Sequence, residues 1–212
     1  MRMLAWVAVW ALWTTPTALA WTDAQVQTAR VRVEVDPQAL ATVRVELRVE
    51  VRAGWLEGLE VAGFDDALRL DDDSVRFEGT DEEGSFHPRV RRRDDGRIQF
   101  RFERRHAPRR GAYRVLFSYV SDLTSVLRPV AEDESHLHVE WTLPGWRSGL
   151  DGVEIALVLP GDAMFGADES ERATVQRDRT TIGEQSRLAW RRAHLPRTLP
   201  WRVTAEVSRS AM

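Results

Sequence analysis

The side chains best placed for chemistry are His136, His138 and Glu140, which alternate along one short segment. Alternate residues of a strand point to the same side about 7 Å apart, so two imidazoles and a carboxylate would face one metal ion. This donor set suits zinc or another divalent transition metal, and Asp133 and Glu134 could add a ligand or a hydrogen-bond partner. The competing interpretation, which we favour, is a polar strand face without a ligand.

Three tryptophans form a second candidate site. Trp55, Trp146 and Trp201 lie near expected strand ends or turns, where exposed aromatic rings can bind sugars. They predict a carbohydrate-binding module as one alternative function. Packing in the core or at an interface is the other explanation for these residues.

The composition excludes several kinds of chemistry. The chain has no cysteine, so disulfides, thiolate metal sites and cysteine nucleophiles are excluded. It also has no lysine, which removes Schiff-base catalysis and the phosphate-binding loop that requires lysine. Neither His-Glu-x-x-His nor Gly-x-Gly-x-x-Gly occurs. We therefore expect no enzyme and no bound cofactor apart from the metal considered above.

The charge and the N-terminus indicate the compartment. A formal net charge of -3 argues against nucleic-acid binding. Residues 1–20 combine Arg2, an apolar run, Pro16 and a final Ala-Leu-Ala, the pattern of a cleaved signal peptide. We expect an exported periplasmic or extracellular protein without a transmembrane segment after cleavage.

Strict alternation of apolar and charged residues dominates the mature chain. Residues 42–52 place Val43, Leu47 and three further valines on one side and Arg or Glu on the other, which predicts a long half-buried strand with a bend or bulge. Residues 28–35 repeat the pattern, and an Asp-Pro turn between the two segments predicts a hairpin. Their outward charges are typical of a solvated face.

A hairpin with an Asp-Gly turn is expected over 88–104, and further strands are expected over 111–120, 136–143 and 152–160. No long helix follows the signal. The 111–120 strand is expected to be buried on both faces. The fold class is therefore all-β: residues 21–212 form an antiparallel, immunoglobulin-like β-sandwich, or two small sandwiches divided near residues 105–112.

A locally basic stretch runs through the middle of the chain. Its arginines are Arg89, Arg91, Arg92, Arg93, Arg97, Arg101, Arg104, Arg105, Arg109 and Arg110. Such a stretch can dock an acidic partner or an anionic surface polymer. Acidic residues between the arginines favour a solvated surface instead.

The region from Tyr113 to Pro160 resembles an uncharacterised bacterial family of predicted membrane proteins with an exported β-sandwich ectodomain. The similar elements are a Tyr-x-Val-x-Phe-x-Tyr strand, a strand that ends in Glu140-Trp141, the Gly145-Trp146 turn, and a Val-x-Ile-x-Leu-x-Leu-Pro strand. The resemblance implies a β-sandwich at the cell envelope and transfers no catalytic residues. That family continues into transmembrane segments. No stretch of this sequence after the predicted signal peptide is apolar enough to cross a membrane, so membrane tethering is not carried over to this chain.

Fold and compartment together predict a non-catalytic exported interaction or structural module of the bacterial cell envelope. Its partner would be an envelope protein or a surface polysaccharide, contacted through charged faces or by strand addition. The alternatives are a carbohydrate-binding module that uses the three tryptophans and a metal-binding protein or metalloenzyme that uses His136, His138 and Glu140.

Overall fold

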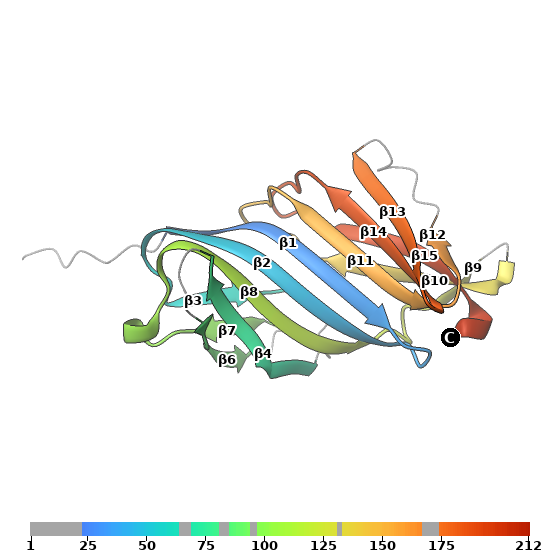
Figure 1. Cartoon of the computed structure of the whole chain (residues 1–212), viewed down its shortest axis with the longest axis horizontal. Helices are drawn as coiled ribbons and strands as arrows, with labels where there is room; N and C mark the ends of the chain where they lie inside the picture. The colour runs from blue at the N-terminus through green and yellow to red at the C-terminus, as the bar shows by residue number, and fades with distance from the viewer. Residues whose placement is uncertain (1–22, 64–68, 81–84, 94–96, 131–132, 167–173) are drawn as a thin grey trace, which may run out of the picture.

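A computed structural model describes residues 23–63, 69–80, 85–93, 97–130, 133–166 and 174–212, which form strands and two single-turn 3-10 helices (Figure 1). The all-β prediction is confirmed. The predicted signal peptide, residues 1–20, lies outside the described residues. Among the residues that are described, no helix is long and apolar enough to cross a membrane.

The largest sheet has eight strands in the order β13-β14-β11-β1-β2-β8-β4-β5. Their bounds are β1 Asp23–Val35, β2 Leu40–Trp55, β4 Arg69–Gly79, β5 Ser85–Phe86, β8 Arg109–Asp122, β11 Val153–Pro160, β13 Val175–Ile182 and β14 Gln185–Arg192.

Two smaller sheets complete the molecule. The four-stranded sheet, β12-β15-β10-β9, consists of Ala163–Phe165, Trp201–Ser208, Asp133–Leu143 and Arg128–Val130. The three-stranded sheet, β3-β7-β6, consists of Gly58–Val61, Ile98–Arg101 and Arg89–Arg92. The 3-10 helices are η1, Arg104–His106, and η2, Arg209–Ala211.

The predicted hairpin of β1 and β2 forms the centre of the large sheet, with Val33 opposite Val43 in an antiparallel register. A carboxylate oxygen of Asp36 closes the turn by accepting hydrogen bonds from the backbone N–H groups of Gln38 and Leu40, both at 2.9 Å. The expected irregularity in the long strand lies at its end, where the β2–β8 register shifts between Val51 and Trp55.

One face of the large sheet is the inner, core-forming face. The alternate apolar residues of neighbouring strands are in register on this face, so that Val31 pairs with both Val45 and Ile155. Each of these three side chains is at most 2% exposed. Burial of such side chains contributes about 1.5–3 kcal/mol each before chain entropy is subtracted.

Both smaller sheets cover this inner face, which makes the fold a β-sandwich (Figure 1). On one side, Phe100 of β7 packs against Phe117 of β8 with ring centroids 5.5 Å apart. On the other, Phe165 of β12 meets Trp190 of β14 edge-to-face at 5.0 Å. In Figure 1 the two small sheets lie towards opposite ends of the large one.

Three features differ from a simple antiparallel sandwich. First, β1 and β11 run parallel, so the large sheet is mixed. Second, β8 is not buried on both faces as predicted, because Val120 is 38% exposed on its outer side. Third, the large sheet contains strands from both sides of residues 105–112, because β2 pairs with β8 along most of its length.

Candidate functional site

The outer face of the large sheet carries a row of alternating charges. The cross-strand register places Arg30 of β1 beside Glu46 of β2 and Glu154 of β11. Arg191 of β14 lies on the other side of Glu154, and Gln176 of β13 extends the row. Five strands therefore fix the position of this row, independently of any loop.

The next row along the strands contains a depression. Here Arg44 of β2 pairs with Arg32 of β1, followed by Ala156 of β11 and Ala189 of β14. Because an alanine side chain ends at Cβ, the long side chains on either side stand above a shallow apolar floor. We call the alternating charge row and this depression the outer-face site.

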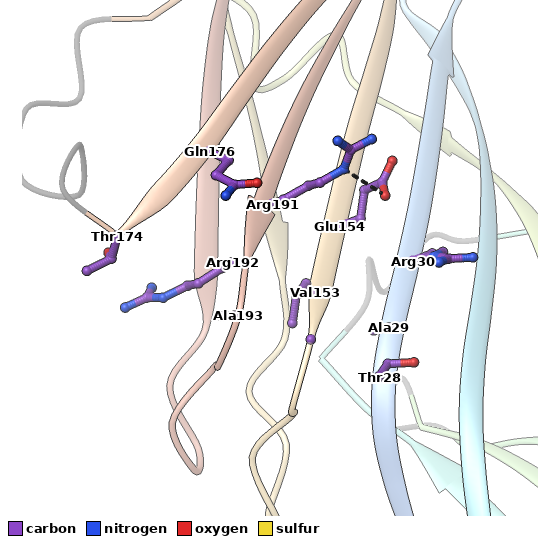
Figure 2. A pocket seen from close by; sticks show the side chains of 11 residues that line it. Thr28, Ala29, Arg30, Val153, Glu154, Thr174, Gln176, Arg191, Arg192 and Ala193 are labelled. Atoms are coloured by element: carbon purple, nitrogen blue, oxygen red, sulfur yellow. Dashed lines mark hydrogen bonds and ion pairs between the residues drawn. The ribbon is translucent and has the colours of Figure 1, made fainter.

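Two cavities adjoin in the outer-face site and share Arg30 and Glu154. One, of about 330 Å³, is lined in part by Thr28, Gln176 and Arg191. The other, of about 320 Å³, includes Arg32, Arg44, Leu116, Ala156 and Arg187 in its lining. Figure 2 shows the first cavity, with the Arg191 side chain extended towards Glu154 and Arg30 across from them on β1.

Single glutamates in the outer-face site (Glu154) and beside it (Glu34) each hold two arginines. Glu154 accepts from Nη2 of Arg187 at 3.0 Å and from Nε of Arg191 at 3.2 Å. Glu34 lies 2.7 Å from guanidinium nitrogens of both Arg32 and Arg44. Burial raises the pKa of Glu34, but the hydrogen bond and positive charge of Arg44, together with Arg32, outweigh it and lower the pKa below its usual value.

This arrangement suits recognition better than bond-breaking chemistry. Arginine forks bind carboxylates with defined geometry, and the alanine floor accepts an apolar side chain. The Glu154 side chain is 24% exposed and ion-paired, so it remains an acceptor for a partner's donors. The outer-face site can therefore hold a protein surface that presents both an apolar group and charges.

The structure places His136, His138 and Glu140 on β10 with the predicted alternation. Nδ1 of His136 lies 2.7 Å from Oδ2 of Asp133, and Oε2 of Glu140 lies 3.5 Å from Arg202. Within the described ranges no group of three or more His, Asp or Glu side chains is arranged to hold a metal ion. The metal site stays a prediction from the sequence.

Asp133 is itself an unusual carboxylate. Hydrogen bonds from the side chain and then the backbone N–H of Ser135, followed by His136, lower its pKa to about 2. The hydroxyl of Ser135 donates to Oδ1 of Asp133 at 2.5 Å. The Asp133 side chain, which lies next to the proposed metal ligands, thus orders the start of β10.

The three tryptophans do not form an exposed platform. Trp201 is only 1% exposed and, as the first residue of β15, lies in the core, which argues against contact with a ligand; its ligand-binding role stays a prediction from the sequence. The Arg104 guanidinium lies 4.3 Å above the Trp55 ring, where a sugar would stack. Trp146 packs partly buried against the core, and its Nε1 has no acceptor among the described residues.

Sequence reasoning identified the arginines and glutamates of β1 and β2 only as a solvated face. The missing information was the position of β11 and β14, which adds Glu154, Arg187 and the alanine floor. The available signal was Ala156, a small residue at an outward position of a strand whose other alternate positions are large.

Comparisons with known proteins bear on the fold. No family model and no curated protein matches the chain. Among solved structures, an M1 zinc metallopeptidase from Deinococcus radiodurans superimposes with a TM-score of 0.56 at 12% identity, covering 88% of this chain and 43% of that one. A putative protease from Parabacteroides distasonis matches with a TM-score of 0.50 at 8% identity, covering 86% and 40%.

These similarities concern the arrangement of strands. At 8–12% identity they show a common fold, and the chain spans less than half of the length of either protein. Nothing in the comparisons bears on the membrane-protein family that the Tyr113–Pro160 region resembles, so that resemblance stays a prediction.

Proposed function

We propose that this chain is a non-catalytic, exported interaction module of the cell envelope that binds another envelope protein through the outer-face site. The observation that carries the proposal is the pair of adjoining cavities on a rigid sheet, with arginines around an alanine floor. Ligand sites of this kind combine apolar surface with a few fixed polar groups.

Two further observations support a role in binding. First, the sequence lacks His-Glu-x-x-His, the helix pattern that binds zinc in metallopeptidases, although the fold resembles part of such enzymes. Second, one of the similar proteins is described as a two-domain M1 zinc metallopeptidase, and the match covers 43% of it. A fold of this type thus occurs there as part of a longer chain.

Site-specific photo-crosslinking in living cells tests the proposal. A photoreactive amino acid replaces Leu116, which lines the outer-face site, or Met164 on β12 as the matched control. Met164 is an apolar side chain, 44% exposed, in the four-stranded sheet. We expect one abundant envelope protein to be captured from position 116 and not from position 164.

A second pair of variants distinguishes binding at the outer-face site from nonspecific capture. Ala156→Gln places a larger side chain on the cavity floor, whereas Val120→Gln makes a similar change at an exposed outer position that does not line this cavity. Capture should fall several-fold for Ala156→Gln alone. No capture from position 116, or equal capture in both glutamine variants, would contradict the proposal.

The carbohydrate-binding alternative retains less support, because Trp201 is buried and Arg104 covers Trp55. Saturable binding of a surface polysaccharide that is lost in Trp55→Ala would restore it.

A further inference from the structure

A third cavity lies beside the three-stranded sheet and shares no lining residue with the two cavities of the outer-face site. It has a volume of about 560 Å³ and is lined by residues of β5, β6, β7 and η1 and by Glu103. Its charged lining is Arg89, Arg101, Arg105 and Glu103, and Phe86 and Phe102 supply apolar surface. We call it the β6–β7 pocket.

Two arginines of this pocket oppose each other directly. Arg89 of β6 and Arg101 of β7 are cross-strand partners in the antiparallel register, and both line the pocket. Like charges at directly opposite positions destabilise a strand pair. The next pair on the same face, Arg91 with Gln99, has no such conflict.

The single carboxylate of the pocket does not neutralise these charges. Glu103 pairs with Arg89 at 2.5 Å and with Arg105 at 3.3 Å. No carboxylate among the described residues forms an ion pair with Arg101. Three guanidinium groups and one carboxylate thus leave two positive charges on the side of the sheet where the register already opposes Arg89 to Arg101.

The charge and size of the pocket indicate the class of ligand. A phosphomonoester carries a charge of about −1.5 to −2 at neutral pH and three strong acceptor oxygens, which match two surplus charges and several guanidinium forks. The side chains of Arg89 and Arg105 are 80% and 76% exposed, so a ligand can reach both and compete with Glu103 for them. The cavity exceeds one phosphate group, and Phe86 and Phe102 can contact the group that the phosphate esterifies.

We propose that the β6–β7 pocket binds a phosphomonoester, with Arg89, Arg101 and Arg105 holding the phosphate oxygens between them. The bound dianion offsets the repulsion of the Arg89–Arg101 pair. This site is independent of the outer-face site and of the partner proposed for it.

Calorimetric titration with phenyl phosphate tests the proposal on the whole mature chain. Arg101→Gln removes one member of the opposed pair. Arg91→Gln is the matched control, since it makes the same charge change on the same face of the hairpin at a residue that does not line the pocket. We expect one saturable site in the wild type, affinity at least about tenfold lower in Arg101→Gln, and little change in Arg91→Gln.

Thermal unfolding provides a second measurement. In phosphate-free buffer of low ionic strength, Arg101→Gln should unfold at a higher temperature than the wild type, because the like-charge pair is gone. Phenyl phosphate should raise the unfolding temperature of the wild type and of Arg91→Gln only. If Arg101→Gln does not fold, Arg89→Gln replaces it as the other member of the pair.

The source of the ester is distinguished by comparing inorganic phosphate, phenyl phosphate and phosphorylated dextran at equal phosphate concentration. Tighter binding of the dextran assigns the site to a surface polymer, and tighter binding of phenyl phosphate assigns it to a small molecule. Absence of a saturable site for all three probes, or the same affinity in wild type, Arg101→Gln and Arg91→Gln, overturns the proposal.

Discussion

Individual side-chain sizes create the outer-face site. Ala156 and Ala189 occupy neighbouring positions on β11 and β14, while β1 and β2 carry Arg32 and Arg44 in the same row. Ala156 lines the cavity beside the guanidinium groups, and Ala189 lies fully buried next to it. Residues of ordinary size at these positions would leave a flat, charged sheet face.

Asp133 permits a prediction about pH at the residue scale. Its folded-state pKa of about 2 lies below its ordinary value of 3.8, so its hydrogen bonds stabilise the start of β10 at higher pH. That contribution is fully present above the ordinary pKa and is lost as the pH falls through about 2. Ser135→Ala should move the Asp133 pKa up towards its ordinary value, because it removes the largest cause of the shift.

A carboxyl-carbon NMR titration measures this change directly. Ser148→Ala, in the turn that follows β10, serves as the control and should leave the titration of Asp133 unaltered. An unaltered pKa of Asp133 in Ser135→Ala would show that the hydroxyl does not hold the carboxylate.

Trp201 shows what residue-level reasoning from sequence leaves open. Its place after Pro200, at the start of an alternating segment, predicts a strand end, and it does begin β15 and pair with Leu143; what the sequence did not predict is its burial. Burial of such a position depends on the sheet that covers it, which local sequence does not specify. Trp55 is only partly accessible for a comparable reason, the distant Arg104.

At the scale of elements, β2 organises the large sheet because its two faces are chemically distinct. Leu47 is fully buried on the inner face, and its neighbour Arg48 is exposed on the outer face. A one-residue slip in register would exchange these environments along the whole strand, so the pattern specifies the register strongly.

Adjacent substitutions on β2 test this distinction. Leu47→Ala should lower the free energy of unfolding by about 2–5 kcal/mol, since it leaves a cavity in the core. Arg48→Ala should change it by no more than about 0.5 kcal/mol, because an exposed side chain is truncated. Guanidinium denaturation measures both. Equal effects of the two substitutions would mean that the inner and outer faces are wrongly assigned.

At the scale of the whole molecule, the continuity of the large sheet determines how the chain folds. β8 begins at Arg109, inside the range 105–112 where a division was expected, yet it pairs with β2, which precedes that range. Separation at this point would expose the inner face of β8 and leave long unpaired edges on both strands.

Fragments 23–107 and 108–212 therefore provide a test of the domain organisation. We expect neither fragment alone to show a cooperative thermal transition, and co-expression to restore one. Circular dichroism follows the transition, with the intact chain as reference. A cooperative transition in an isolated fragment would instead favour the two-sandwich alternative near residues 105–112.

The sequence by itself determined the all-β class, the β1–β2 hairpin and the inward residues of the central strands. These follow from a period of two and from turn chemistry at Asp36, which act between residues that are close in the chain. The tertiary structure alone decided that β11 lies parallel to β1, which brings Glu154 beside Arg30. Alternation specifies which side of a strand is buried, but it does not specify which distant strand will pair with it.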